Sequence, residues 1–92
     1  MDRAQQYEPR AQRWRALAKF PNGRESLIIL GNSITQVRET YAQAWLDDSL
    51  FDPSARRACL EIVVQSWRGV ADRGGWVGRG VLPLPKEEIE AA

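Results

Sequence analysis

Three carboxylates crowd together in the middle of the chain, at Asp47, Asp48 and Asp52. Such carboxylates can bind a magnesium ion. The ion is usually held by one or two carboxylates together with water molecules and substrate phosphates. Asp52, however, directly precedes Pro53 and is better explained as the N-cap of a helix. Asp47 and Asp48 form the polar end of the helix before it. We therefore expect neither a metal ion nor a catalytic carboxylate here.

The side chains that most other active sites need are missing. The chain has no histidine and one cysteine, Cys59. This excludes a zinc site of imidazole and thiolate ligands, a disulfide framework, and a Ser-His or Cys-His nucleophile pair. Cys59 and Tyr41 fall on apolar faces and are expected in the core, and Gly31 alone is too little for a phosphate-binding loop. The sequence predicts a non-enzymatic protein without metal or cofactor.

Arginine and tryptophan are the residue types here that are best suited to contact. The chain contains four tryptophans, and its basic residues are eleven arginines and two lysines. Both types are enriched at the energetic centres of binding interfaces, and four tryptophans exceed what a small core easily hides. This favours a protein-binding module, such as an adaptor, an inhibitor or an assembly accessory. The residues expected to make the contact are Trp67, Arg68, Trp76 and Arg79, with Trp14 as an addition.

The alternative is an accessory nucleic-acid-binding protein. The net charge of +1 selects no partner, but residues 1–24 hold six basic and two acidic side chains. Phosphate contact combined with ring stacking is how single strands are held without base specificity. On this hypothesis the Arg/Trp-rich C-terminal segment acts together with a basic N-terminal helix, whose contact residues are Arg10, Arg13, Arg15 and Lys19.

The helices and strands that must position these residues are predicted from the spacing of apolar residues and from the positions of proline, glycine and capping residues. Residues 53–67 are apolar over about two-thirds of a helical circumference, which suits a central core helix or a subunit interface equally. We predict an α+β fold of three helices and a two-stranded sheet in the order α-β-α-α-β, which pairing across a homodimer could extend. Its elements are a helix over 9–20, a strand over 25–30, a helix that begins with a capping box at Ser33 and Gln36, a helix over 53–67, and an edge strand within 76–82 beside the first strand.

The length of 92 residues predicts one small domain, 1–92, with frayed tails at 1–7 and 86–92. No apolar run suits a secretory signal or a membrane span. The lone cysteine fits a reducing compartment. We therefore expect a cytoplasmic protein without a membrane partner.

The C-terminal quarter of the chain resembles a known family. The residues Trp67-Arg68-Gly69-Val70, then Asp72, a glycine at 74 or 75, and Leu82-Pro83 are similar to the C-terminal stretch of small tail-assembly chaperones of long-tailed phages. The segment 76–80 departs from that pattern. The resemblance implies an α-rich, non-catalytic protein of a phage or mobile element that binds other proteins. It assigns no site residue.

Overall fold

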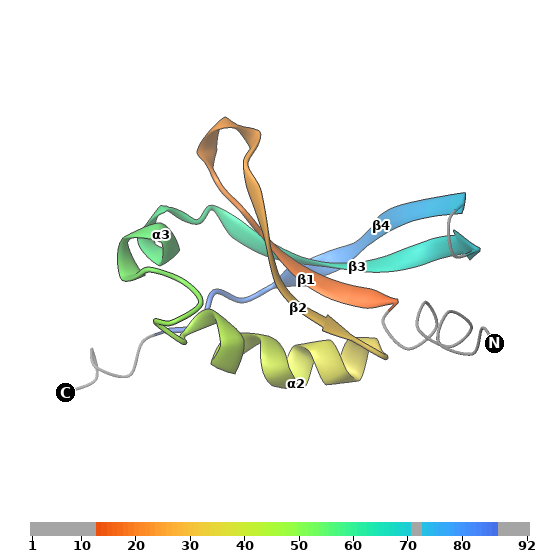
Figure 1. Cartoon of the computed structure of the whole chain (residues 1–92), viewed down its shortest axis with the longest axis horizontal. Coiled ribbons are helices and arrows are strands. Elements are labelled where there is room, and N and C mark those ends of the chain that lie inside the picture. The colour runs from red at the N-terminus through yellow and green to blue at the C-terminus, as the bar shows by residue number, and fades with distance from the viewer. Residues whose placement is uncertain (1–12, 71–72, 87–92) are drawn as a thin grey trace.

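A four-stranded antiparallel sheet forms the centre of the molecule, and its long helix lies across one face (Figure 1). The computed structural model describes residues 13–70 and 73–86. The strands lie in the order β2-β1-β3-β4. The elements in chain order are β1 (Trp14–Lys19), a 3-10 turn η1 (Pro21–Gly23), β2 (Glu25–Gly31), α2 (Ile34–Trp45), α3 (Pro53–Ala58), β3 (Glu61–Val70) and β4 (Arg73–Leu82).

Strand β1 takes the place of the N-terminal helix that the sequence predicted. Ala16 and Ala18 are fully buried beneath the helices, whereas Arg15, Leu17 and Lys19 alternate with them and point to the opposite face. The same few apolar residues fit the spacing of a helix and also the two-residue alternation of a strand. The segment is a strand because it pairs with β2 on one side and with β3 on the other. The prediction of a helix over 9–20 is therefore wrong where the chain is described; residues 9–12 lie outside the described residues.

Helix α2 was correctly predicted, and its cap explains where it begins. The Ser33 side chain accepts a hydrogen bond from the backbone N–H of Gln36, 3.1 Å away, and Gln36 Oε1 accepts one from the N–H of Asn32 at 2.6 Å. Val37, Tyr41 and Trp45 are buried against the sheet. A Cβ at Gly31 would lie 2.8 Å from a methyl of Val37. Gly31 therefore allows β2 and α2 to pack closely.

The third predicted helix is a helix for six residues only. Asp52 caps α3 and Pro53 opens it, as expected, but α3 ends at Ala58 and β3 begins at Glu61. Ile62 and Val64 are fully buried, while Val63 between them points away from the helices. The apolar residues that were assigned to one broad helical face therefore lie, from Glu61 onward, on the two faces of a β-strand. The β-branched residues among them favour a pleated surface. The prediction of a helix over 53–67 is wrong beyond Ala58.

Strand β4 lies at the edge of the sheet, as Pro83 and Pro85 predicted, but it pairs with β3 and not with β2. It is also longer than expected and contains a bulge at Arg79. Taken together, the predicted fold of three helices and two strands is wrong: the described chain has four strands, one long helix and one short helix. No helix in the described part of the chain is long and apolar enough to cross a membrane.

The outer ends of β3 and β4 project beyond the rest of the sheet (Figure 1). The last residue of β3 that pairs with β1 is Ser66. Beyond it, residues 67–70 of β3 have their strand partners among residues 73–76 of β4. We call this two-stranded ribbon the arm. The face of the sheet that carries α2 is the inner face, and the opposite face is the outer face.

Candidate functional site: an arginine-rich ribbon

Two tryptophans and an arginine form a stack on the outer face where the arm begins. Trp67 and Trp76 lie opposite each other on β3 and β4 and meet edge to face, with ring centroids 5.3 Å apart. The guanidinium of Arg15 lies over the Trp76 ring, 4.1 Å from its centroid. Its Nε also donates a hydrogen bond to Gln65 Oε1 at 2.7 Å. Burial lowers the pKa of Arg15 from its ordinary value, but arginine remains charged at neutral pH.

A second arginine of the N-terminal segment binds the arm directly. Arg13 Nη2 donates to the carbonyl of Gly69 at 2.6 Å, and the Arg13 carbonyl accepts from the N–H of Trp67 at 2.7 Å. The indole N–H of Trp67 donates in turn to the Val70 carbonyl at 3.1 Å. These contacts join residues from opposite ends of the sequence and hold the ribbon against the start of β1.

Three further arginines lie along the inner face. Alternation from the buried Ser66 places Arg68 on this face, and Arg73 shares it because its partner in the ladder is Val70. Arg79, in the β-bulge, donates from Nε to the Ser66 hydroxyl at 2.8 Å. All three residues are exposed. This face of the ribbon therefore presents guanidinium groups to solvent.

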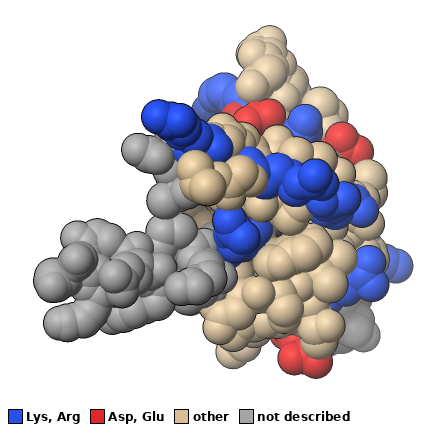
Figure 2. Space-filling model, turned by 90° about the vertical axis from the view of Figure 1, so that its right-hand side faces the viewer, with Lys and Arg blue, Asp and Glu red and all other residues tan. Residues whose placement is uncertain are grey.

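Positive charge accordingly gathers at this end of the molecule. Figure 2, which faces the arm end, shows Lys and Arg side chains across the surface with few acidic ones among them. Between residues 62 and 85 the sequence has one acidic residue, Asp72, which lies outside the described residues. The described acidic residues lie on the helices, on the loop between them, or at the far ends of β2 and β3 (Glu25, Glu39, Asp47, Asp48, Asp52 and Glu61).

Two glycines make the ribbon narrow. A Cβ on Gly74 would lie 2.1 Å from the carbonyl oxygen of Arg68, and one on Gly69 would lie 2.3 Å from that of Arg73. Gly69 also has a φ of 119°, which favours glycine. The two strands of the arm therefore approach each other at a point where no other residue type fits.

The structure brings together most, but not all, of the residues that the sequence singled out. Trp67, Trp76, Arg68 and Arg79 lie on or beside the arm, and Arg13 and Arg15 join them from β1. Trp14 packs against the core at the start of β1 and is less available for contact. Lys19 lies at the other end of β1, where its ammonium is 3.6 Å from the Glu25 carboxylate. Arg10 lies outside the described residues.

Sequence reasoning did not include Arg73 among the contact residues, and it placed the N-terminal arginines on a helix and not on a strand beside the arm. The available signal was Trp67-x-Gly69 facing Gly74-x-Trp76, which is a hairpin pattern with aromatic residues in register. The supposed helices over 9–20 and 53–67 concealed that pattern.

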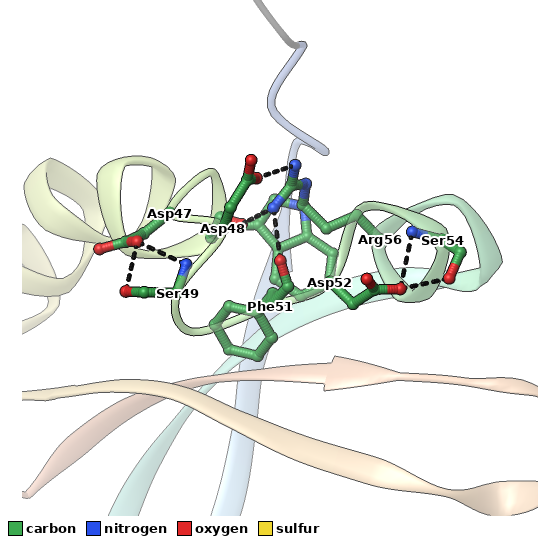
Figure 3. A network of polar contacts seen from close by, with 8 residues as sticks. Asp47, Asp48, Ser49, Phe51, Asp52, Ser54 and Arg56 are labelled. Carbon is green, nitrogen blue, oxygen red and sulfur yellow. Dashed lines mark hydrogen bonds and ion pairs between the residues drawn. The ribbon is translucent and has the colours of Figure 1, made fainter.

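The cluster of acidic residues is structural, as the sequence predicted for Asp52 (Figure 3). Asp47 accepts hydrogen bonds from the N–H and hydroxyl of Ser49, and Asp52 accepts the corresponding two from Ser54. These hydrogen bonds lower the pKa of both carboxyls. Asp48 pairs with Arg56 at 2.7 Å. Among the described residues no group of three His, Cys, Asp or Glu side chains is placed to hold a metal ion.

Cys59 is buried, and its thiol donates to the Glu61 carbonyl at 3.3 Å. Burial raises the pKa of this thiol, so the reactive thiolate is disfavoured. The hollows at the other end of the molecule, of about 320 Å³ each, lie around Phe20 and Arg24 and are open to solvent. A third hollow, of about 410 Å³, lies beside Arg38, Tyr41 and Pro83.

Comparison with known proteins adds no relative: no protein-family model, curated protein or solved structure matches the chain. The resemblance to phage tail-assembly chaperones thus stays a prediction. The α-rich fold that it implied is not the fold observed, because the residues that carry the resemblance form β3 and β4.

Proposed function

We propose that the protein is a non-enzymatic nucleic-acid-binding module whose arm enters a groove of duplex DNA. The observation that carries this proposal is the convergence of five arginines, Arg13, Arg15, Arg68, Arg73 and Arg79, on one ribbon without a carboxylate in its described part. Guanidinium groups bind phosphates through two parallel hydrogen bonds and release condensed counterions when they do so.

The shape of the arm supports the choice of partner. A two-stranded β-ribbon fits the major groove of B-form DNA, which is about 12 Å wide. Arginines lie on both sides of the arm: Arg15 stacks on Trp76 on the outer face, and Arg68, Arg73 and Arg79 lie on or beside the inner face. A groove has a phosphate-lined wall on either side, whereas an acidic patch on a protein would meet one face only. The major groove of duplex RNA is too narrow for side chains to read.

This proposal reverses the order of the two functions that the sequence favoured. Trp67 and Trp76 were expected to bind another protein, but their rings contact each other and Arg15. Their first role is therefore to hold the arm in shape. The proposal keeps a non-catalytic role, which is supported by the lack of a Ser-His or Cys-His nucleophile pair in the sequence. It also keeps a cytoplasmic location, which is supported by the single, buried Cys59.

The test is the affinity of the full chain for a short fluorescein-labelled DNA duplex, measured by fluorescence anisotropy. Arg68→Gln and Arg73→Gln together should weaken binding about tenfold or more, since each removes one phosphate contact. Arg57→Gln is the matched control, because Arg57 is equally exposed but lies on α3 at the other end of the molecule. The wild-type chain should bind this duplex more tightly than duplex RNA of the same sequence.

An unchanged affinity in the double variant would contradict the proposal, as would an equal loss in the Arg57→Gln control. Equal affinity for duplex RNA would contradict the insertion of the arm into a DNA groove.

A further inference from the structure

An exposed valine lies at the end of β3 in the arm, next to two of its arginines. Val70 is the last residue of β3 and the direct partner of Arg73, the first residue of β4. It shares the inner face with Arg68, which lies two positions before it on the same strand. The Val70 side chain is 62% exposed although it is purely aliphatic. The arm therefore carries an apolar group among the guanidinium groups that are proposed to bind phosphates.

The backbone at Val70 is held in place by hydrogen bonds. The indole N–H of Trp67 donates to the Val70 carbonyl at 3.1 Å, and Arg13 Nη2 donates to the preceding carbonyl, that of Gly69, at 2.6 Å. The Val70 side chain is thus presented from a fixed backbone. A contact made by a side chain that is already in position costs less conformational entropy on binding.

Gly75 leaves open space beside Val70. It is the partner of Arg68 and lies diagonally opposite Val70 on the inner face. A Cβ on Gly75 would meet no atom of the described chain within 4 Å, and its φ is not in the positive range that favours glycine. Neither packing nor backbone conformation within the described chain therefore accounts for this glycine. Such a glycine in a strand often marks the close approach of a ligand.

The floor of the DNA major groove offers an apolar group to a side chain in this position. In the proposed function the two faces of the arm meet the phosphate-lined walls, so the end of the arm lies nearest to the base edges. Those edges present hydrogen-bonding groups, which an aliphatic side chain cannot use, and the C5-methyl group of thymine, which it can contact. The base 5-methylcytosine carries a methyl group on the same ring atom.

We propose that Val70 recognises the 5-methyl group of a pyrimidine in the major groove. This inference rests on the proposed function and adds a base preference to it. Contacts between arginine and phosphate carry no sequence information, whereas an apolar contact with a base edge does. Burial of one methyl group changes the affinity about fourfold.

The test compares the affinities of the full chain for duplexes that differ only in these methyl groups, measured by fluorescence anisotropy. One pair is an alternating adenine-thymine duplex and its counterpart with uracil in place of thymine. The other pair is an alternating guanine-cytosine duplex and its counterpart with 5-methylcytosine. The wild-type chain should bind the methylated member of a pair about fourfold or more tightly. The pair that shows this difference identifies the pyrimidine.

Val70→Thr should remove the preference, because threonine has nearly the same shape but carries a hydroxyl in place of one methyl. Val81→Thr is the matched control, since Val81 is 64% exposed but lies near the other end of β4, away from the arm. It should keep the preference of the wild-type chain. Both variants should keep the wild-type salt dependence, because neither loses a phosphate contact.

Salt-dependent binding with equal affinity for the two members of each pair would overturn this inference and leave the proposed function standing. A preference that Val70→Thr retains, or that Val81→Thr loses to the same extent, would also overturn it. A chain that binds none of these duplexes would overturn both the inference and the proposed function.

Discussion

The guanidinium of Arg15 lies 4.1 Å from the centre of the Trp76 ring, which joins the first strand of the chain to the last. Strand β3 separates β1 from β4 in the sheet, so this contact spans a whole strand on the outer face. Through it, the arm is fixed to the body of the sheet on the side where Trp67 completes the stack.

Arg15→Lys should lower the free energy of unfolding by about 1–2 kcal/mol, although it keeps the charge. Lysine lacks the planar guanidinium that stacks on Trp76 and cannot reproduce the same hydrogen bond to Gln65. Arg24→Lys is the matched control. Arg24 is also placed over an aromatic ring, that of Phe20, but at 5.1 Å and on an exposed turn. Urea unfolding should show a larger loss of unfolding free energy for Arg15→Lys than for Arg24→Lys. Equal losses would show that the stack of Arg15 on Trp76 contributes no more than the contact of Arg24 with Phe20.

Gly74→Ala should disrupt the arm, whereas Gly75→Ala should not. The added Cβ at residue 74 would lie 2.1 Å from the carbonyl of Arg68, but at residue 75 it meets nothing within 4 Å. We expect Gly74→Ala to lose about 2 kcal/mol or more of stability and to weaken DNA binding. Thermal unfolding and anisotropy on both variants check this. Equal behaviour of the neighbouring variants would contradict the close approach of the two strands.

Arg56 should matter much more for stability than the carboxylate that it pairs with. Arg56 is buried and donates to the carbonyl of Phe51 at 2.8 Å, while its ion-pair partner Asp48 is 71% exposed (Figure 3). Arg56→Met should cost about 2–3 kcal/mol, because it leaves backbone carbonyls without a donor. Asp48→Asn should cost less than about 1 kcal/mol, since exposed charges contribute little. Chemical denaturation distinguishes the two, and a larger loss in Asp48→Asn would contradict this account.

Stability should fall as the pH rises above about 9. Burial raises the pKa of the Cys59 thiol in the folded chain, and burial also raises that of Tyr41, whose hydroxyl donates to the Pro83 carbonyl at 2.7 Å. In the unfolded chain these groups lose their protons near their ordinary pKa values, about 8.5 and 10. The unfolded state then binds fewer protons than the folded state, so alkali favours unfolding.

Urea unfolding at a series of pH values measures this decline. Cys59→Ala should flatten the part that begins near pH 9, and Tyr41→Phe should flatten the part that begins near pH 10. A decline of unchanged steepness in both variants would contradict the assignment.

Local signals predicted the parts of the fold that depend on local chemistry. The Ser33 cap, the Asp52-Pro53 helix start and the apolar run at 25–30 all lie where the sequence placed them, because each depends on contacts within a few residues. The identity of β1 and β3 depends on pairing between residues about fifty positions apart. Neither the spacing of Trp14, Leu17 and Ala18 nor the apolar arc from Ala58 to Trp67 contains that information.

The site shows the same division. Trp67, Arg68, Trp76 and Arg79 could be singled out by residue type, since aromatic and guanidinium groups are suited to contact. Their assembly with Arg13 and Arg15 could not, because a helix over 9–20 would have turned those arginines in different directions. Only antiparallel pairing of β1 with β3 places them beside the arm.

The most direct test of the central claim is the salt dependence of duplex DNA binding by the full chain. Each phosphate contact contributes about −0.9 to the slope of log K against log salt concentration. The three arginines on or beside the inner face therefore predict a slope of about −2.7 or steeper. Arg68→Gln should make it shallower by about 1. A slope near zero, or a slope that Arg68→Gln leaves unchanged, would contradict the claim that the arm binds nucleic acid.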